Sequence, residues 1–302
     1  MIFTVPGMIL ARNRQLGILL VLVSTLLWST AGLFVRMAEL DIWSIVGWRS
    51  AFSFVTLGTF MLVRNRMTAG DNVGRQFGWL GLFAGSVSVV ATISYVAALQ
   101  WTTVANVMIV YAALPFLATL IAFLWLRERV TKRFILAGSV AFLGVVLTVG
   151  AAVSPRDLLG IGAAFVMTAG FALQLVIARR HPAMDSTAIT VLAAGGALLV
   201  ALPFMPGGVP APQQLLACAL YGILTTGIAY ILILMGSRLI GAAEASLLSL
   251  LDVVLGPLWV WIFYDERVGL PVLAGGAVVL TAVVWYIVYG AGETAADIAP
   301  AE

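Results

Sequence analysis

The sequence is short of charge and of reactive side chains. Charged residues make up 10% of the 302 positions, against about 25% in soluble domains, and hydrophobic residues make up 62%. With one cysteine, Cys218, the chain has no disulfide framework and no thiolate cluster for a metal ion. Its single histidine, His181, and its single lysine, Lys132, both lie in polar breaks between apolar segments.

These absences exclude several classes of function. An intramembrane hydrolase needs a serine paired with a histidine, and a di-metal enzyme needs clustered histidines and carboxylates. The sequence also has no Gly-x-x-x-x-Gly-Lys-Ser/Thr motif, so it holds no ATP at a P-loop. The basic residues are spread over short loops, so we expect no nucleic-acid partner. We therefore predict no enzyme activity, no catalytic residue, no metal and no cofactor.

Long apolar segments are what the sequence has in abundance. A helix of roughly 20 apolar residues crosses a hydrocarbon core of about 30 Å. The sequence therefore predicts an all-α membrane protein surrounded by lipid, without a loop long enough for a soluble domain. Ten segments have this character and are numbered here as spans 1 to 10: 16–36, 43–63, 77–99, 104–126, 134–152, 158–178, 187–206, 214–236, 243–264 and 269–290.

The basic residues predict the orientation of these spans. If the N-terminus is cytoplasmic, twelve of the 16 basic residues fall on the cytoplasmic side. Only Arg36, Arg156 and Arg267 fall outside, and Arg49 falls within span 2. This positive-inside bias places both termini in the cytoplasm. No cleavage site follows Met1–Arg14, so span 1 is expected to be uncleaved.

A short motif recurs at a spacing of 138 residues. Leu126 to Val130, followed by Gly138, aligns with Tyr264 to Val268, followed by Gly276. Residues 1–153 and 154–302 each hold five of the predicted spans. Because five is an odd number, the second half enters the membrane upside down, which predicts two inverted five-helix repeats. Many secondary transporters have this architecture, whereas a channel or a scaffold does not require it.

These residues resemble the drug/metabolite transporter superfamily, in its ten-helix branch of two EamA-type repeats. The resemblance covers about residues 16–290. It rests on Trp28, Arg49, Leu114-Pro115, Glu128-Arg129-Val130-Thr131, Glu266-Arg267-Val268 and Gly275-Gly276. Where the second repeat usually has an acidic residue followed by proline, this chain has Asp252-Val253, and the proline is Pro257. We therefore expect the helix break of span 9 to be displaced by about one turn.

Within the superfamily, the chain is similar to bacterial exporters of aromatic amino acids. The resemblance implies a secondary transporter of the bacterial cytoplasmic (inner) membrane that exports amino acids or related small metabolites by alternating access, without needing an oligomer. It also implies a central cavity lined by spans 1, 3, 4, 6, 8 and 9. An alternative is a multidrug exporter of lipophilic cations or nucleobase-like metabolites by proton antiport. Proton-coupled and facilitated export both fit the sequence.

Asp252 lies near the middle of span 9, where an aspartate costs roughly 2.5–3.5 kcal/mol, so it must face protein or water. On a helical wheel, Ser249, Gly256 and Trp259 share its face, which predicts a cavity wall. One interpretation is that Asp252 binds the substrate or couples transport to protons. The other is structural, with Asp252 accepting hydrogen bonds from serines or from amides near Pro257.

Aromatic and polar residues of the other spans complete the expected site. Trp28 lies too deep for an interfacial tryptophan, and Tyr95 belongs to a polar stripe of span 3. Each of these side chains also has a packing interpretation, because small polar and aromatic groups join helices in membranes. The predicted substrate-binding residues are Trp28, Tyr95, Tyr111, Phe171, Gln174, Tyr230, Asp252 and Trp259.

Span 8 carries two rows of polar residues. Thr226 and Tyr230 lie one turn apart, and Tyr221 and Thr225 form the second row. We expect one row to line the cavity, and we favour the row of Tyr230.

Arg49 is the one basic residue within a span, and we assign it a structural role. Its long stem can extend past Trp48 to the interface, or it can pair with Glu39 or Asp41. Glu244 begins span 9, where a carboxylate suits the positive end of a helix.

Overall fold

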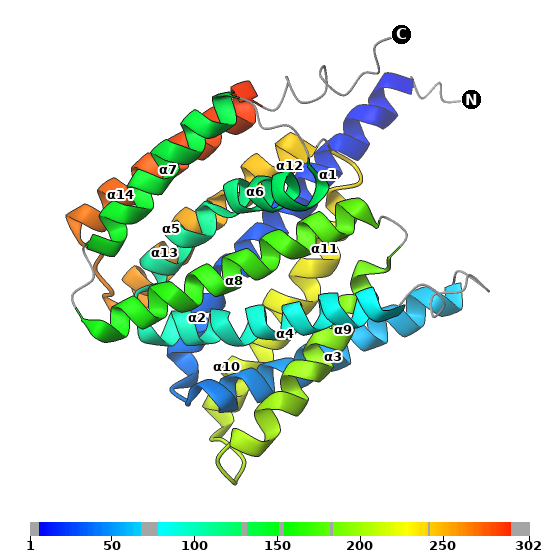
Figure 1. Cartoon of the computed structure of the whole chain (residues 1–302). Helices are drawn as coiled ribbons and strands as arrows, with labels where there is room; N and C mark the ends of the chain where they lie inside the picture. The colour runs from blue at the N-terminus through cyan, green and yellow to red at the C-terminus, as the bar shows by residue number, and fades with distance from the viewer. Residues whose placement is uncertain are drawn as a thin grey trace.

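In the computed structural model the chain is a bundle of helices (Figure 1). The structure describes residues 6–67, 78–127, 132–150, 154–181, 184–240 and 242–290. Glu128 to Val130 of the repeated motif and residue 153 at the expected boundary lie outside these ranges. The elements are α1 (Pro6–Ser29), α2 (Ala31–Ala38), α3 (Ile42–Met67), α4 (Gly78–Trp101), α5 (Val104–Ala112), α6 (Leu114–Leu126), α7 (Lys132–Gly150), α8 (Pro155–Arg180), α9 (Ser186–Ala201), η1 (Leu202–Phe204), α10 (Pro212–Leu220), η2 (Tyr221–Ile228), α11 (Ala229–Gly236), α12 (Ala242–Ser249), α13 (Leu251–Tyr264), α14 (Leu270–Trp285) and η3 (Tyr286–Gly290).

The helices have the length and the surface of membrane spans. Large hydrophobic side chains cover their outer faces, with Trp79 81% exposed, where lipid replaces water as the solvent. The chain is therefore an all-α membrane protein, and the count of ten spans stays a prediction. A seventh span is added if the bent pair α5 and α6 is counted as one. Among the described residues, six stretches pass on length and composition: Arg14–Ala38, Ile42–Met67, Gly78–Trp101, Pro155–Arg180, Ser186–Phe204 and Pro212–Gly236.

Three of the predicted spans are broken into two helices. Span 1 breaks at Thr30, span 4 breaks at Ala113 with a bend of 40°, and span 9 breaks at Leu250. The expectation of a break displaced toward Pro257 is wrong, because Pro257 lies inside α13. A membrane helix continues through proline where neighbouring groups satisfy the freed carbonyl. The breaks of spans 4 and 9, at Ala113 and Leu250, are separated by nearly the 138-residue spacing of the repeated motif. They therefore fall at nearly equivalent places in the two halves.

Helices of the first half pack mainly on helices of the second. The most extensive contacts join α4 to α8, α7 to α14, α3 to α9 and α1 to α11. In the predicted repeat, spans 1 to 5 correspond to spans 6 to 10 in order. The contact between spans 3 and 6 (α4 and α8) therefore corresponds to the contact between spans 8 and 1 (α11 and α1). The same correspondence returns the contacts of spans 2 and 7 and of spans 5 and 10 to themselves. This is the pairing that two related halves produce.

One end of the bundle, called here the basic end, holds the beginning of α1 and the end of α3. There Arg14 pairs with Glu244 at 2.6 Å, and Arg64 pairs with Asp185, which also caps α9. Burial raises the pKa of Asp185, but the hydrogen bond and the charge of Arg64 hold it below its ordinary value. These ion pairs join the first half to the second where α1 meets α12 and where α3 meets α9.

Candidate functional site

A cavity of about 440 Å³ lies between the two halves. This volume falls within the range of small-molecule sites. The lining comes from spans 1, 3, 4, 6, 8 and 9, as the resemblance implies, and also from α3 and α9 of spans 2 and 7. Toward the basic end the lining reaches Ala178, Met184 and Ser186. In the opposite direction the described lining stops near Arg49 and Met108.

Seven of the eight predicted residues lie together on the cavity wall: Trp28, Tyr95, Tyr111, Phe171, Gln174, Tyr230 and Asp252. The rings of Tyr111 and Phe171 meet edge to face, with centroids 6.3 Å apart at 83°. Trp259 is not among the lining residues, and its indole N–H donates to Ser29 Oγ at 2.8 Å. Although Trp259 shares a helical face with Asp252, seven residues separate them, which is about 10 Å along the helix.

Asp252 belongs to the first turn of α13, directly after the break at Leu250. It is 7% exposed, and its Oδ1 has no hydrogen-bond partner among the described residues. The serine and amide contacts that a structural role requires are therefore not made by this oxygen. The break exposes the positive end of a half-helix at the cavity, and that end favours negative charge.

Arg49 also lines the cavity, although we expected a structural role for it. Its side chain is 6% exposed, and its guanidinium carbon lies 4.7 Å from the centroid of the Tyr221 ring. The expected pairing with Glu39 or Asp41 is absent from the described contacts, since the Asp41 carboxylate accepts hydrogen bonds from backbone amides at the start of α3. Arg49 is thus a buried cation without a carboxylate partner among the described residues.

Close helix packing fixes Arg49 in this place. Ser53 Oγ donates to the carbonyl oxygens of Arg49 at 2.8 Å and of Gly222 at 3.2 Å. A Cβ added to Gly222 would lie 2.4 Å from the Arg49 carbonyl oxygen, so only glycine permits this approach. The contact between α3 and η2 therefore holds the guanidinium against Tyr221.

Both polar rows of span 8 face the cavity, not one of them as we expected. Tyr221, Thr225, Thr226 and Tyr230 all belong to the lining. The reason is the π-helix η2, in which each hydrogen bond reaches one residue further than in an α-helix. The wider turn brings side chains from both rows onto the cavity side.

Several polar atoms of the lining are buried and have no hydrogen-bond partner within the part of the chain that the structure describes. They are Arg49 Nε, Gln174 Nε2, Tyr221 Oη, Thr225 Oγ1 and Asp252 Oδ1. Buried polar atoms in proteins are normally satisfied by protein, water or ligand. The lining can therefore bind a ligand through several hydrogen bonds as well as through its aromatic faces.

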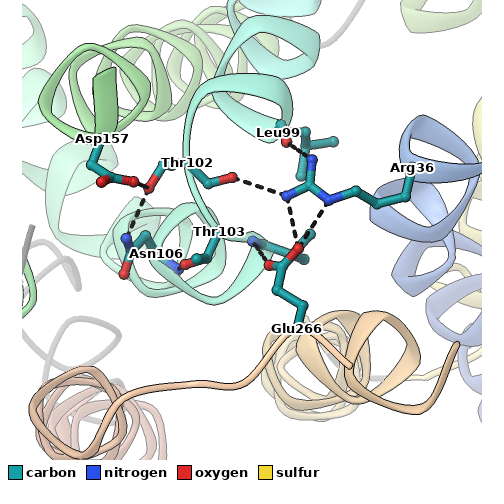
Figure 2. Close-up of polar contacts among 8 residues, drawn as sticks. Arg36, Leu99, Thr102, Thr103, Asn106, Asp157 and Glu266 are labelled. Atoms are coloured by element: carbon teal, nitrogen blue, oxygen red, sulfur yellow. Dashed lines mark hydrogen bonds and ion pairs between the residues drawn. The ribbon is translucent and has the colours of Figure 1, made fainter. Parts of the chain in front are cut away.

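At the opposite end of the bundle, called here the Glu266 end, a polar network joins helices of the two halves (Figure 2). Arg36 pairs with Glu266 at 2.8 Å and donates to the carbonyl oxygens of Leu99 and Thr102. Glu266 Oε1 accepts a hydrogen bond from Val104 N at 2.8 Å. The network joins spans 1, 3 and 4 to the segment that follows span 9.

The same network continues to α8. Thr102 Oγ1 donates to Asp157 Oδ1 at 3.1 Å and accepts from Asn106 Nδ2 at 2.8 Å (Figure 2). Asp157 also accepts from Ser154 Oγ at 2.7 Å. The Glu266 carboxylate and Thr102 therefore connect the first half of the chain to the segment after span 9 and to the beginning of span 6.

The backbone before Glu266 sets its position. Asp265 has a φ of 49°, in the left-handed region that non-glycine residues adopt rarely. This conformation ends α13 and turns the next residue toward the amide of Val104. Arg127, at the equivalent place in the first half, has a φ of 55°.

The comparisons with known proteins agree with this geometry. The EamA-like transporter family matches the chain twice, over residues 15–150 and 155–288. The chain belongs to this family. An uncharacterized transporter of Archaeoglobus fulgidus is 27% identical over 282 residues, which is 91% of this chain and 98% of the relative. A solved crystal structure with 19% identity shares the fold, with a TM-score of 0.64 over 92% of this chain and 97% of the other.

This EamA-like protein is accordingly a multi-pass membrane transporter for a small molecule. Sequence reasoning missed three contributors to its candidate site: Arg49, Tyr221 and Thr225. The signal for Arg49 was present, because Arg49 and Ser53 lie one helical turn apart in an otherwise apolar span. No comparable signal exists for η2, because its hydrogen-bond register leaves no mark in the side-chain pattern.

Proposed function

We propose that this transporter exports amino acids with large apolar or aromatic side chains from the cytoplasm. The observation that carries the proposal is the cavity wall, where aromatic rings stand beside a buried carboxylate oxygen of Asp252 and a buried guanidinium nitrogen of Arg49, neither of which has a hydrogen-bond partner among the described residues. Aromatic faces bind a large apolar side chain, and the two opposite charges orient a zwitterion.

The proposed direction follows from charge. The cavity lining reaches the basic end, where Arg64, Arg179 and Arg180 also lie, and the positive-inside rule makes such an end cytoplasmic. The structure would then be the conformation open to the cytoplasm, with the Glu266 end closed toward the outside. Alternating access requires a second conformation in which these roles are exchanged, as inverted repeats allow.

Labelling of single cysteines tests this orientation. With Cys218→Ser as background, Arg156→Cys should react with an impermeant thiol reagent added outside intact cells. His181→Cys should react only after permeabilisation. The measurement is the labelled fraction of each variant, and the opposite pattern would reverse the proposed direction.

Counterflow in proteoliposomes tests the substrate. Purified protein should exchange labelled L-phenylalanine against internal L-phenylalanine. Trp28→Ala and Tyr95→Ala should each slow the exchange by up to roughly tenfold, since an aromatic contact contributes about 0.5–1.5 kcal/mol beyond the area it buries. Trp261→Ala, at a side chain that is 54% exposed outside the cavity, is the matched control.

A lipophilic cation is the competing substrate, because the Asp252 carboxylate and the aromatic rings also suit a cation. Tetraphenylphosphonium is therefore included in the same assay. Exchange of this cation without exchange of any amino acid would overturn the proposed substrate class, and normal exchange in both Trp28→Ala and Tyr95→Ala would place the binding site elsewhere.

A further inference from the structure

We propose that Arg49, Tyr221 and Thr225 form an anion subsite that binds the carboxylate of the transported substrate. The inference deepens the proposed function and rests on it for the substrate's side chain. It adds that a carboxylate is required, and it names the residues that recognise this group.

The three side chains are neighbours at one end of the cavity. The Arg49 guanidinium stacks on the Tyr221 ring at 4.7 Å, and Thr225 follows Tyr221 by four residues within η2. Close packing at Gly222 and the hydrogen bonds of Ser53 fix the backbone of Arg49 against the same segment. The subsite is therefore preorganised by the contact of α3 with η2.

The chemistry of the unpartnered atoms selects an acceptor. Arg49 Nε, Tyr221 Oη and Thr225 Oγ1 are all buried, and none has a hydrogen-bond partner among the described residues. The guanidinium nitrogen only donates, and both hydroxyl groups can donate. Arg49 Nε therefore requires an acceptor, and both hydroxyl groups can donate to the same ligand; a carboxylate offers two acceptor oxygens with the spacing of a guanidinium.

The charge of Arg49 points the same way. A buried cation in a membrane span is costly unless an anion faces it, and no described carboxylate contacts Arg49. The stacking on Tyr221 stabilises the guanidinium, and Arg49 Nε has no hydrogen-bond partner among the described residues. A substrate carboxylate supplies both the missing charge and the missing acceptors.

Asp252 gives the bound substrate a direction. It stands on a different helix from Arg49, and both residues line the same cavity together with Tyr95. The field between the two charges therefore favours a zwitterion with its carboxylate toward Arg49 and its ammonium group toward Asp252. A lipophilic cation gains nothing from Arg49 and is repelled by it.

Three ligands that share one side chain separate the charged groups. L-Phenylalanine carries both charges, phenethylamine lacks the carboxylate, and 3-phenylpropanoate lacks the ammonium group. Binding of each to the purified full-length protein in detergent is measured by isothermal titration calorimetry. Wild-type protein should bind L-phenylalanine at least about tenfold more tightly than phenethylamine, the size of one charge-assisted contact.

Variants of Arg49 identify the residue responsible. Arg49→Gln should weaken L-phenylalanine and 3-phenylpropanoate by at least about tenfold and leave phenethylamine within about twofold. Arg49→Lys should restore part of the loss, because it keeps the charge but not the planar fork of donors. Tyr221→Phe, which keeps the ring beneath Arg49, should weaken the binding of only the two ligands that carry a carboxylate, L-phenylalanine and 3-phenylpropanoate. Arg156→Gln, at an exposed arginine of α8, is the matched control.

The outcomes separate this inference from the proposed function. Unchanged binding of L-phenylalanine by Arg49→Gln, or an equal loss of all three ligands in Arg49→Lys and Tyr221→Phe, overturns the anion subsite and leaves amino-acid export standing. Binding of 3-phenylpropanoate that depends on Arg49, without binding of L-phenylalanine, supports the subsite and overturns amino-acid export. Absence of binding for all three ligands in wild-type protein contradicts both.

Discussion

Glu266→Ala is expected to open the Glu266 end and to shift the transporter away from the conformation described here. The carboxylate accepts from Arg36 and from Val104 N, and its side chain is only 17% exposed. Loss of one partner from such a buried pair costs about 2–4 kcal/mol. The conformational equilibrium should therefore change by roughly thirtyfold to a thousandfold.

A reporter cysteine measures this shift. Met108 lines the cavity on the side of the Glu266 end and is 3% exposed. In the Cys218→Ser background, Met108→Cys should react slowly with an impermeant thiol reagent added outside, and Glu266→Ala should raise this rate at least about tenfold. Arg267→Ala changes the adjacent residue, whose side chain is 80% exposed, and should leave the rate unchanged. An unaltered rate in Glu266→Ala would mean that other contacts hold this end closed.

Asp252→Asn is expected to fold and to lose most transport. Asparagine keeps the size of the side chain but removes the negative charge and the ability to carry a proton. A contact between charged groups contributes about 1.5–3 kcal/mol, so exchange of L-phenylalanine should fall at least about tenfold. If Asp252 couples transport to protons, the remaining activity should also lose its dependence on pH.

The comparison of two substitutions separates function from structure at Asp252. A structural role predicts near-normal exchange in Asp252→Asn and loss of folded protein in Asp252→Leu. A functional role predicts that both variants remain folded, as judged by size-exclusion chromatography, and that both fail in exchange. Wild-type rate and pH profile in Asp252→Asn would remove Asp252 from the transport mechanism.

Much of the fold is visible in the sequence because the membrane imposes simple rules. Apolar length predicts where the helices lie, since a helix in lipid must satisfy its own backbone. The repeated motif around Glu266 predicts that the chain has two related halves. The sequence does not show that Glu266 of this motif joins helices, because its partners Arg36 and Val104 are 230 and 162 residues away in the sequence.

For the candidate site, the sequence predicts which face of a helix a side chain occupies. It does not predict how far along the helix axis the cavity extends or which residues of other helices a side chain contacts. The helical wheel places Trp259 beside Asp252, but the rise along α13 carries Trp259 toward Ser29 and away from the cavity. Arg49 stands out in sequence by its cost in lipid. Its neighbours follow from the packing of α3 on η2, which sequence spacing does not encode.

The π-helical register of η2 has a consequence for how this transporter tolerates insertions and deletions. Each hydrogen bond of a π-helix reaches one residue further than in an α-helix, so removal of one residue from Tyr221–Ile228 would return this segment to the α-helical register. Tyr221 and Thr225 would then rotate relative to Tyr230 without any change in their own identity. Cavity shape in this span is therefore set by the number of residues as much as by their kind.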